Sequence, residues 1–267
     1  MTSRASSHGT TPSLATRAGS RRDAKVLVVG IGGIGSPAIL ALVRAGVGVI
    51  GLADDDVVER SNLHRQILFR DADADIGTSK LDAARAAIAR IAPDVEVRAH
   101  ATRLLPHNAV DLVRHYDVVV EGSDNFATKF LTSDACAIAR VPVVHAAAVR
   151  WYGTAFAVGP RGAPCYRCLF EDFPEGDAPN CAEAGVVGPM VGVIGALEAD
   201  LALSIVDALA AAGDPDVYGE LVTFDGRDDA FRRRHVAARP DCALCGTAPR
   251  IQSIQPHRYV AGAAACA

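Results

Sequence analysis

The sequence has no excess of basic residues. Its 267 residues contain 27 Lys and Arg against 31 Asp and Glu, which gives a formal net charge of -4 at pH 7. The isoelectric point is near 6.0. A protein that coats nucleic acid needs a basic surface that displaces counterions from phosphates. We therefore expect no nucleic-acid partner, although a local basic pocket is compatible with these numbers.

The sequence also lacks a long apolar run that is free of charge. Its most apolar stretch, residues 186–212, contains Glu198, Asp200 and Asp207. Carboxylates at this density would be costly in the hydrocarbon of a membrane, so we expect a buried helix and no membrane span. Aromatic residues make up only 5% of the chain, but half of all residues are apolar. That is enough for one large α/β domain with a core of its own.

The first two dozen residues lack acids and lack an apolar run. They contain no Asp or Glu before Asp23 and are rich in Ser, Thr, Ala and Arg. A secretory signal needs an apolar segment, so we expect residues 1–24 to form a disordered tail, with an organelle transit peptide as the less favoured alternative. Four of the seven cysteines form two C-x-x-C pairs. Such pairs suit metal or redox chemistry in a reducing compartment, so we expect a cytoplasmic location.

Alternating strand and helix patterns predict the fold class. Residues 25–29 form a continuous apolar run that ends at Gly30, as expected for a central strand of a parallel sheet. A helix should follow, with Ser36 and Pro37 in its first turn and a stop at Gly46. The same reasoning predicts further strands at 48–52, 95–97, 116–120 and 141–145, and helices at 80–91 and 126–139. This order predicts a Rossmann-like α/β fold with a doubly wound, mostly parallel sheet.

The pattern changes after Trp151. Short segments such as 154–158 and 220–224 are joined through loops rich in Gly and Pro, which predicts an antiparallel C-terminal extension of the same sheet. No break in composition marks a linker. We therefore expect one domain over residues 25–246, followed by a C-terminal tail over residues 247–267.

Four glycines lie between the first predicted strand and the first predicted helix, in the pattern Gly30-x-Gly32-Gly33-x-Gly35. Without side chains, they let backbone N–H groups and the helix N-terminus approach phosphate oxygens. Asp54 follows at about the distance at which an acid of dinucleotide-binding proteins contacts a ribose hydroxyl. The glycines predict a nucleotide loop but do not distinguish ATP from NAD. A purely structural role in helix–strand packing is less favoured.

Four further motifs separate these alternatives. They are Asp54-x-Asp56, Ser61-Asn62-Leu63-His64-Arg65-Gln66, Gly77-x-x-Lys80, and Ser123-Asp124-Asn125 at the end of a later strand. With the glycine loop, they resemble the nucleotide site of the ubiquitin-activating-enzyme superfamily, in particular the ThiF and MoeB adenylyltransferases that act on sulfur carriers. The resemblance covers residues 25–246. Transfer of AMP to a carboxylate needs cations and a metal to screen anionic reactants, whereas NAD chemistry needs no such set.

The resemblance implies a role for each residue of this set. Asp54 would bind the ribose, while Asn62, Arg65 and Lys80 would hold phosphates, with Gln66 beside them. Asp124 would bind Mg²⁺, and Arg65, Lys80 and Asp124 would be the catalytic residues. The rest of the ATP site would consist of Gly30, Gly32, Gly33, Gly35, Asp56 and Asn125. Taken singly, Arg65 and Lys80 would be interpreted as solvated surface charges.

The two C-x-x-C pairs predict a metal site. Cys165 and Cys168 form one pair, Cys242 and Cys245 form the other, and each lies in a loop beside Gly or Pro. Two such pairs can supply four thiolates to one tetrahedral Zn²⁺ of a closed, structural kind. Binding would fasten the C-terminal segment to the middle of the chain. Two unrelated buried or redox pairs are the less favoured interpretation.

Cys181 stands apart from these pairs. It matches the position at which some members of the superfamily carry a cysteine that bonds to the activated carrier or to a sulfur donor. A nucleophilic role and a bystander thiol are both open. We expect Cys136 to pack in the core and Cys266 to be a stray thiol.

The resemblance has one gap. Bacterial members begin with an Arg-Tyr-x-Arg-Gln-like motif whose arginine crosses a dimer interface into the partner's nucleotide site, and the sequence has no such motif. Its candidate arginines, which lie in no recognisable helical pattern, are Arg4, Arg17, Arg21 and Arg22. The arginine that would act across the dimer is therefore unassigned.

The resemblance implies a homodimer that uses ATP and Mg²⁺ to adenylate the C-terminal carboxylate of a ubiquitin-like sulfur carrier with a Gly-Gly tail. A separate sulfur donor would then form the thiocarboxylate. The alternatives are a related adenylating enzyme that acts on a peptide or a tRNA-linked carboxylate, an NAD-dependent oxidoreductase, and a carrier-binding scaffold without catalysis.

Overall fold

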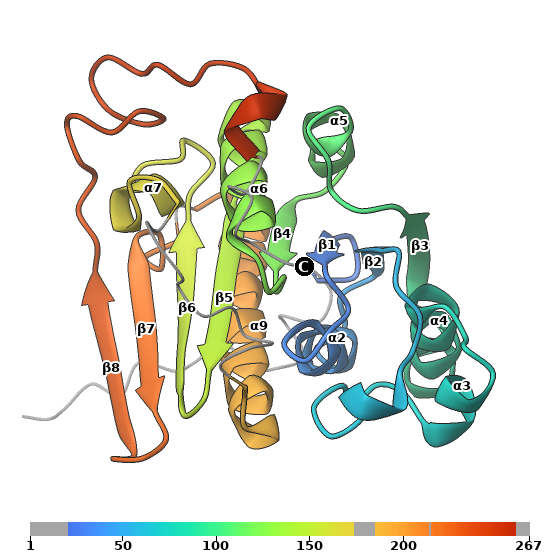
Figure 1. The fold of residues 1–267 in the computed structure, drawn as a ribbon. Coiled ribbons are helices and arrows are strands. Elements are labelled where there is room, and N and C mark those ends of the chain that lie inside the picture. The colour runs from blue at the N-terminus through green and yellow to red at the C-terminus, as the bar shows by residue number, and fades with distance from the viewer. Residues whose placement is uncertain (1–20, 174–184, 214, 260–267) are drawn as a thin grey trace, which may run out of the picture.

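The computed structural model describes residues 21–173, 185–213 and 215–259. Its centre is one eight-stranded sheet in the order β3-β2-β1-β4-β5-β6-β7-β8 (Figure 1). Strands β3 to β5 in this order pair in parallel, and β6, β7 and β8 add antiparallel strands. The parallel strands are β1 (Lys25–Val29), β2 (Val49–Asp54), β3 (Glu96–Ala101), β4 (Val118–Glu121) and β5 (Val143–Val149). The predicted α/β fold with an antiparallel C-terminal extension is confirmed.

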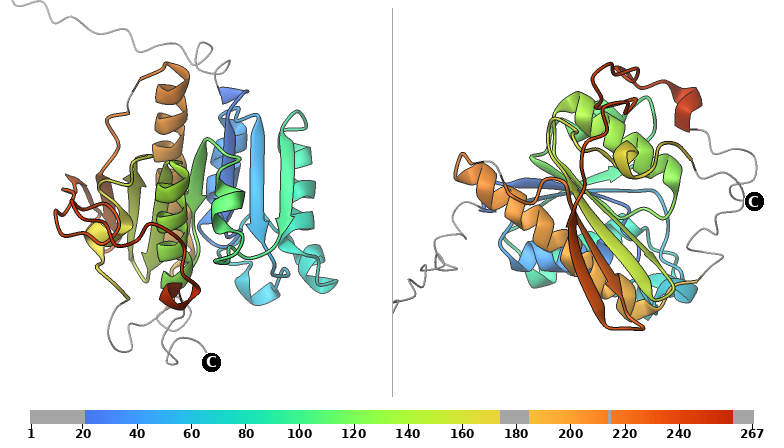
Figure 2. Two further views of the ribbon diagram at one scale, coloured as in Figure 1. Left: turned by 90° about the horizontal axis from the view of Figure 1, so that it is seen from above. Right: turned by 90° about the vertical axis from the view of Figure 1, so that its left-hand side faces the viewer.

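Helices cover both faces of the sheet (Figure 2). One face packs against α2 (Gly35–Arg44), α4 (Lys80–Ile91) and α9 (Gly188–Ala210), and the other against α5 (Ala109–Val113), α6 (Phe126–Ala139) and α7 (Tyr166–Leu169). Because the strands of the parallel half face helices on both sides, β1 and β4 are almost completely buried. Aliphatic side chains dominate both core clusters.

Local sequence signals explain where the helices begin. Ser79 caps α4 by accepting a hydrogen bond from the Asp82 N–H group (3.1 Å), and Asn125 caps α6 by accepting one from Thr128 N–H (2.8 Å). Side-chain oxygens at this position satisfy the free N–H groups of a first helical turn. Both helices occupy the predicted ranges.

Helix α9 is long and apolar enough to cross a membrane by length and composition. In the structure 56% of its most apolar stretch is buried inside the protein. It packs on α2 and on strands β4 to β6, and Glu198 in its middle is completely buried. The prediction of a buried helix is confirmed.

The antiparallel half consists of β6 (Tyr152–Val158), β7 (Glu220–Asp225) and β8 (Ala230–His235). Only the first two of these strands were expected. The remaining short elements, which were also not expected, are η1 (Arg60–Asn62), α3 (Asp71–Asp75) and η2 (Pro256–Tyr259).

The described ends of the chain contact the domain. The Arg21 guanidinium forms two hydrogen bonds of 2.8 Å with the Asp207 carboxylate at the end of α9. At the other end, Tyr259 is buried and its hydroxyl donates to Asp134 Oδ2 (2.8 Å). Residues 1–20 and 260–267 of the two expected tails lie outside the described residues.

Candidate nucleotide site and four-cysteine centre

The glycine loop connects β1 to α2 and is tightest at Gly35. Gly30 has a φ of +83°, which favours glycine, and its N–H group donates to Ala53 O (3.0 Å). A Cβ atom at Gly35 would overlap the carbonyl oxygen of Gly30. The loop therefore folds back on itself, and the first turn of α2 lies directly behind it.

Three predicted segments meet at this loop. A Cβ at Gly33 would lie 3.4 Å from Cγ and Cδ of Arg65, and one at Gly32 would lie 3.9 Å from Nε2 of Gln66. A Cβ at Gly30 would lie 3.4 Å from the backbone of Ser123. The structure thus brings together the glycine loop, the segment of Arg65 and Gln66, and the turn that leads to Asp124.

Asp54 fixes the start of the loop. Its carboxylate is 9% exposed and accepts hydrogen bonds from Ile31 N–H (2.7 Å) and from Asp56 N–H (2.9 Å). Each carboxylate oxygen has two lone pairs, so these contacts leave capacity for a ribose hydroxyl. The predicted ribose contact is compatible with this placement.

Lys80 is buried at the edge of the site and is paired with an acid. Its Nζ lies 2.9 Å from Oδ2 of Asp56. Arg103 bonds Asp55 through Nε (2.8 Å) and lies 3.4 Å from Asp56 Oδ1. Burial opposes the charged form of Asp56, but Lys80 and Arg103 outweigh it and hold the pKa of that carboxyl below its usual value. The Lys80 side chain is therefore held in one orientation by Asp56. Asp55 pairs with Arg103.

The remaining predicted residues lie nearer the solvent. Asp124 is exposed and directly follows Ser123, whereas the Asn125 side chain caps α6. Asn62 Nδ2 donates to Glu59 Oε2 (3.1 Å), and Arg65 Nη1 lies 3.3 Å from His64 Nε2. Their predicted contacts with ATP stay predictions.

Sequence reasoning missed two groups at this site. Arg103 follows β3 without a motif, and its bonds join residues 48 positions apart. Glu121 at the end of β4 is completely buried and bonds both Lys129 and the Ser123 turn. The notable signal for Glu121 was a lone acid at the end of an apolar strand.

The four predicted metal ligands converge on one point. The sulfur atoms of Cys165 and Cys242 are 3.4 Å apart, those of Cys168 and Cys245 are 3.4 Å apart, and those of Cys165 and Cys168 are 3.9 Å apart. A tetrahedral zinc with bonds of about 2.3 Å separates its sulfurs by roughly 3.8 Å, whereas a disulfide needs about 2.05 Å. The donor set and its spacing fit a zinc ion.

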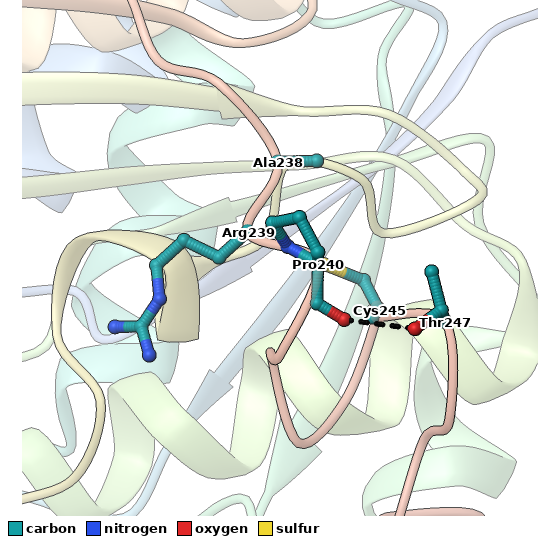
Figure 3. Close-up of a pocket in the computed structure, with 6 residues that line it drawn as sticks. Ala238, Arg239, Pro240, Cys245 and Thr247 are labelled. Carbon is teal, nitrogen blue, oxygen red and sulfur yellow. Dashed lines mark hydrogen bonds between the residues drawn. The ribbon is translucent and has the colours of Figure 1, made fainter.

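The surroundings of the cysteines hold the loops in place. The backbone N–H of Arg239 donates to Cys168 Sγ (3.4 Å), and its guanidinium pairs with Glu171 and Asp241. A cavity of about 290 Å³ opens beside Cys245 (Figure 3), where Thr247 Oγ1 donates to Pro240 O (3.2 Å). This cavity borders the four-cysteine centre, not the glycine loop.

The other cysteines fall into two groups. Cys136 is buried, and burial raises the pKa of its thiol, in agreement with the expected core position. Cys181 and Cys266 lie outside the described residues.

Comparisons with known proteins point to one family. The model of the ThiF family matches residues 18–244. The "Adenylyltransferase and sulfurtransferase MOCS3" of Sus scrofa is 43% identical over 244 residues, which are 91% of this chain and 52% of that protein. The "SAMP-activating enzyme E1" of Haloferax volcanii is 40% identical over 237 residues, 88% of this chain and 85% of that protein. The chain thus spans about half the length of the MOCS3 relatives.

Solved structures show the same fold. The crystal structure of Escherichia coli MccB with ATP has a TM-score of 0.72 at 21% identity and covers 87% of this chain and 69% of that one. The structure of MccB with AMPCPP and MccA has a TM-score of 0.74 at 22% identity, covering 87% and 69%.

Proposed function

Because the chain belongs to the ThiF family, we propose that it is an ATP-dependent adenylyltransferase that activates the C-terminal carboxylate of a ubiquitin-like sulfur carrier. The names of its relatives support an adenylyltransferase and an activating enzyme of the E1 type. The proposal rests mainly on one observation. The glycine loop lies beside Arg65, Gln66 and the Asp124 turn at the carboxyl ends of the parallel strands.

The residues at these strand ends suit transfer of AMP. The carrier carboxylate would attack the α-phosphorus of ATP, forming one P–O bond while the bond to the β-phosphate breaks and pyrophosphate leaves. Charge then moves onto the leaving pyrophosphate, and Arg65, Lys80 and the N-terminus of α2 would stabilise it. Asp124 would hold Mg²⁺, which would further neutralise the charge of the triphosphate.

The acyl-adenylate would then accept a sulfur nucleophile from a separate donor, releasing AMP. We also propose that the four cysteines hold a structural zinc, and that the protein is a cytoplasmic homodimer. Size-exclusion chromatography with light scattering tests the dimer, since a monomer at micromolar concentration would contradict it.

ATP–pyrophosphate exchange tests the function. Exchange should require a carrier with a Gly-Gly tail and should stop when the same carrier lacks its last glycine. Arg65→Ala should lower the exchange rate, and Arg60→Ala is the matched control because Arg60 is exposed and pairs with Asp71 and Asp75.

Two outcomes would contradict the proposal. The first is no exchange with any Gly-Gly carrier, including one co-purified from the native host. The second is stabilisation of the protein by NAD and not by ATP with Mg²⁺ in a thermal-shift comparison. If exchange depends instead on a peptide without a ubiquitin-like fold, the proposed adenylation stands and the proposed substrate is wrong.

A further inference from the structure

A completely buried acid, Glu121, lies beneath the nucleotide loop at the end of β4. Its Oε2 atom accepts a hydrogen bond from Lys129 Nζ (2.8 Å) and lies 3.1 Å from His145 Nδ1. Its Oε1 atom accepts from the Ser123 N–H group (2.9 Å) and from the Ser123 hydroxyl. The carboxylate therefore joins helix α6 and strand β5 to the turn that follows β4.

The charges around Glu121 make it an anion. Burial opposes ionisation, but Lys129 and His145 outweigh it and lower the pKa of Glu121 to about 2. Burial lowers the pKa of His145, whose Nδ1 lies 3.1 Å from Oε2 of Glu121. Burial and the charge of Glu121 raise the pKa of the neighbouring Glu198 well above its usual value. Lys129 forms an ion pair with Glu121, and its Nζ also donates to Ala146 O (2.6 Å).

The turn held by Glu121 leads directly to the mouth of the site. The Gly122 N–H group donates to Val29 O (3.1 Å), and a Cβ at Gly122 would lie 3.2 Å from the backbone nitrogen of Gly35. Ser123 packs on Gly30 in the same way. Asp124 is the next residue and is exposed, so the orientation of its side chain depends on how firmly residues 122 and 123 are fixed.

We propose that Glu121 is a positioning residue for the nucleotide site: its carboxylate fixes the Gly122–Ser123 turn against the glycine loop and thereby aims Asp124 at the metal-bound triphosphate. The inference rests on the proposed function. A stabilising role alone is a weak explanation, because buried ion pairs can often be replaced by apolar residues without loss of stability. A residue that contacts a metal ligand but not the metal itself contributes to metal binding by orienting that ligand.

A second buried ion pair on the same helix provides a matched control. Asp134 is completely buried, and Arg167 bonds it through Nε (3.0 Å) and Nη2 (2.9 Å). Asp134 also accepts from the Tyr259 hydroxyl (2.8 Å). This pair lies beside the four-cysteine centre, and within the described residues it has no hydrogen bond or ion pair with the glycine loop. Its loss therefore tests stability without disturbing the Gly122–Ser123 turn.

The test compares two double variants that replace each pair by apolar residues, E121L/K129M and D134L/R167M. E121L/K129M leaves the Ser123 N–H group, the Ser123 hydroxyl and His145 Nδ1 without their carboxylate, and D134L/R167M leaves the Tyr259 hydroxyl without its own. Calorimetric titration with ATP at fixed Mg²⁺ should show affinity roughly 10- to 100-fold weaker for E121L/K129M and unchanged for D134L/R167M. Equal affinities for wild type and E121L/K129M, or equal losses in both doubles, would overturn the inference.

Amide hydrogen exchange separates this inference from the proposed function. Exchange at the Ser123 amide should be faster in E121L/K129M than in wild type, whether or not ATP binds, and unchanged exchange there refutes the role of Glu121. A wild type that fails to bind ATP would instead refute the proposed function. If E121L/K129M does not fold, Ser123→Ala keeps the ion pair and should weaken ATP binding roughly fivefold, and unaltered binding would count against the inference.

Discussion

The wild-type protein should become less stable as pH rises, because of the buried acid Glu198. Glu198→Gln should remove this pH dependence. Glu198 lies in α9 and is completely buried, and within the described residues neither of its carboxyl oxygens has a hydrogen-bond partner. Burial, and then the negative charge of Glu121, raise its pKa well above 4.5. The folded protein therefore keeps a proton that the unfolded chain releases above its own pKa.

The sign and size of the effect follow from this difference. Above the unfolded pKa the unfolded chain binds fewer protons than the folded protein, so the free energy of unfolding falls by about 1.4 kcal/mol per pH unit until the folded pKa is reached. Each pH unit between the unfolded and the folded pKa contributes this amount. Gln has no proton to release, so Glu198→Gln lacks this slope.

The assay is urea unfolding of wild type and Glu198→Gln at pH 5.5, 6.5 and 7.5, followed by circular dichroism. The difference between the two free energies should grow with pH in favour of the variant, whatever its constant part. Asp94→Asn is the control because Asp94 is exposed, and its difference from wild type should stay level. A difference that is equally level for Glu198→Gln would refute the reasoning.

Three other substitutions test the metal centre and the nucleotide loop. Cys242→Ser removes one of four thiolates and should abolish metal binding and lower Tm, so one zinc per chain in the purified variant would contradict the zinc site. Gly35→Ala should displace the loop, abolish ATP binding and cost about 1–3 kcal/mol of stability, because the added Cβ overlaps Gly30 O. Gly192→Ala is the control and should bind ATP normally, because among the described residues its added Cβ would have no atom within 4 Å apart from the neighbouring backbone of its own helix. Lys80→Met keeps the buried stem without the charge and should weaken ATP binding by roughly 10- to 100-fold, as measured by calorimetry; unchanged affinity would exclude a phosphate contact.

The parallel half of the fold could be predicted because its elements carry strong periodic signals. Helices α4 and α6 occupy the predicted ranges, since apolar residues repeat at helical spacing between clear caps. Strand β5 begins at Val143 and not at 141, and it continues to Val149. Its final residues pair with β6, and such pairing is not visible in a local pattern.

Strand β8 could not be predicted. Five of its six residues are exposed, and three consecutive arginines replace the alternation of apolar and polar side chains that marks a half-buried strand. Its conformation is set by the register with β7, where Val222 lies opposite Arg233. Helix α5 was missed for a different reason, because its five residues are too few to show a period.

The same distinction between local patterns and long-range contacts applies to the residues of the candidate site. Asp54 could be proposed from its spacing after the glycine loop and Arg65 from the resemblance of its motif to a known family. The two cysteine pairs could be matched because thiolates at that spacing have few other uses. Arg103 and Lys129 could not be found this way. Their partners lie on other strands or loops, and the contacts exist only once the sheet has formed.

The metal centre joins cysteines that leave the ribosome at different times. Cys165 and Cys242 are 77 positions apart, so at 5–20 residues per second the first pair waits roughly 4 to 15 seconds for the second. During this interval two neighbouring thiols can oxidise to a disulfide or hold a metal with half of its ligands. With the proposed zinc at this site, the order of translation would make biogenesis of this domain sensitive to the supply of zinc and to the redox state around the nascent chain.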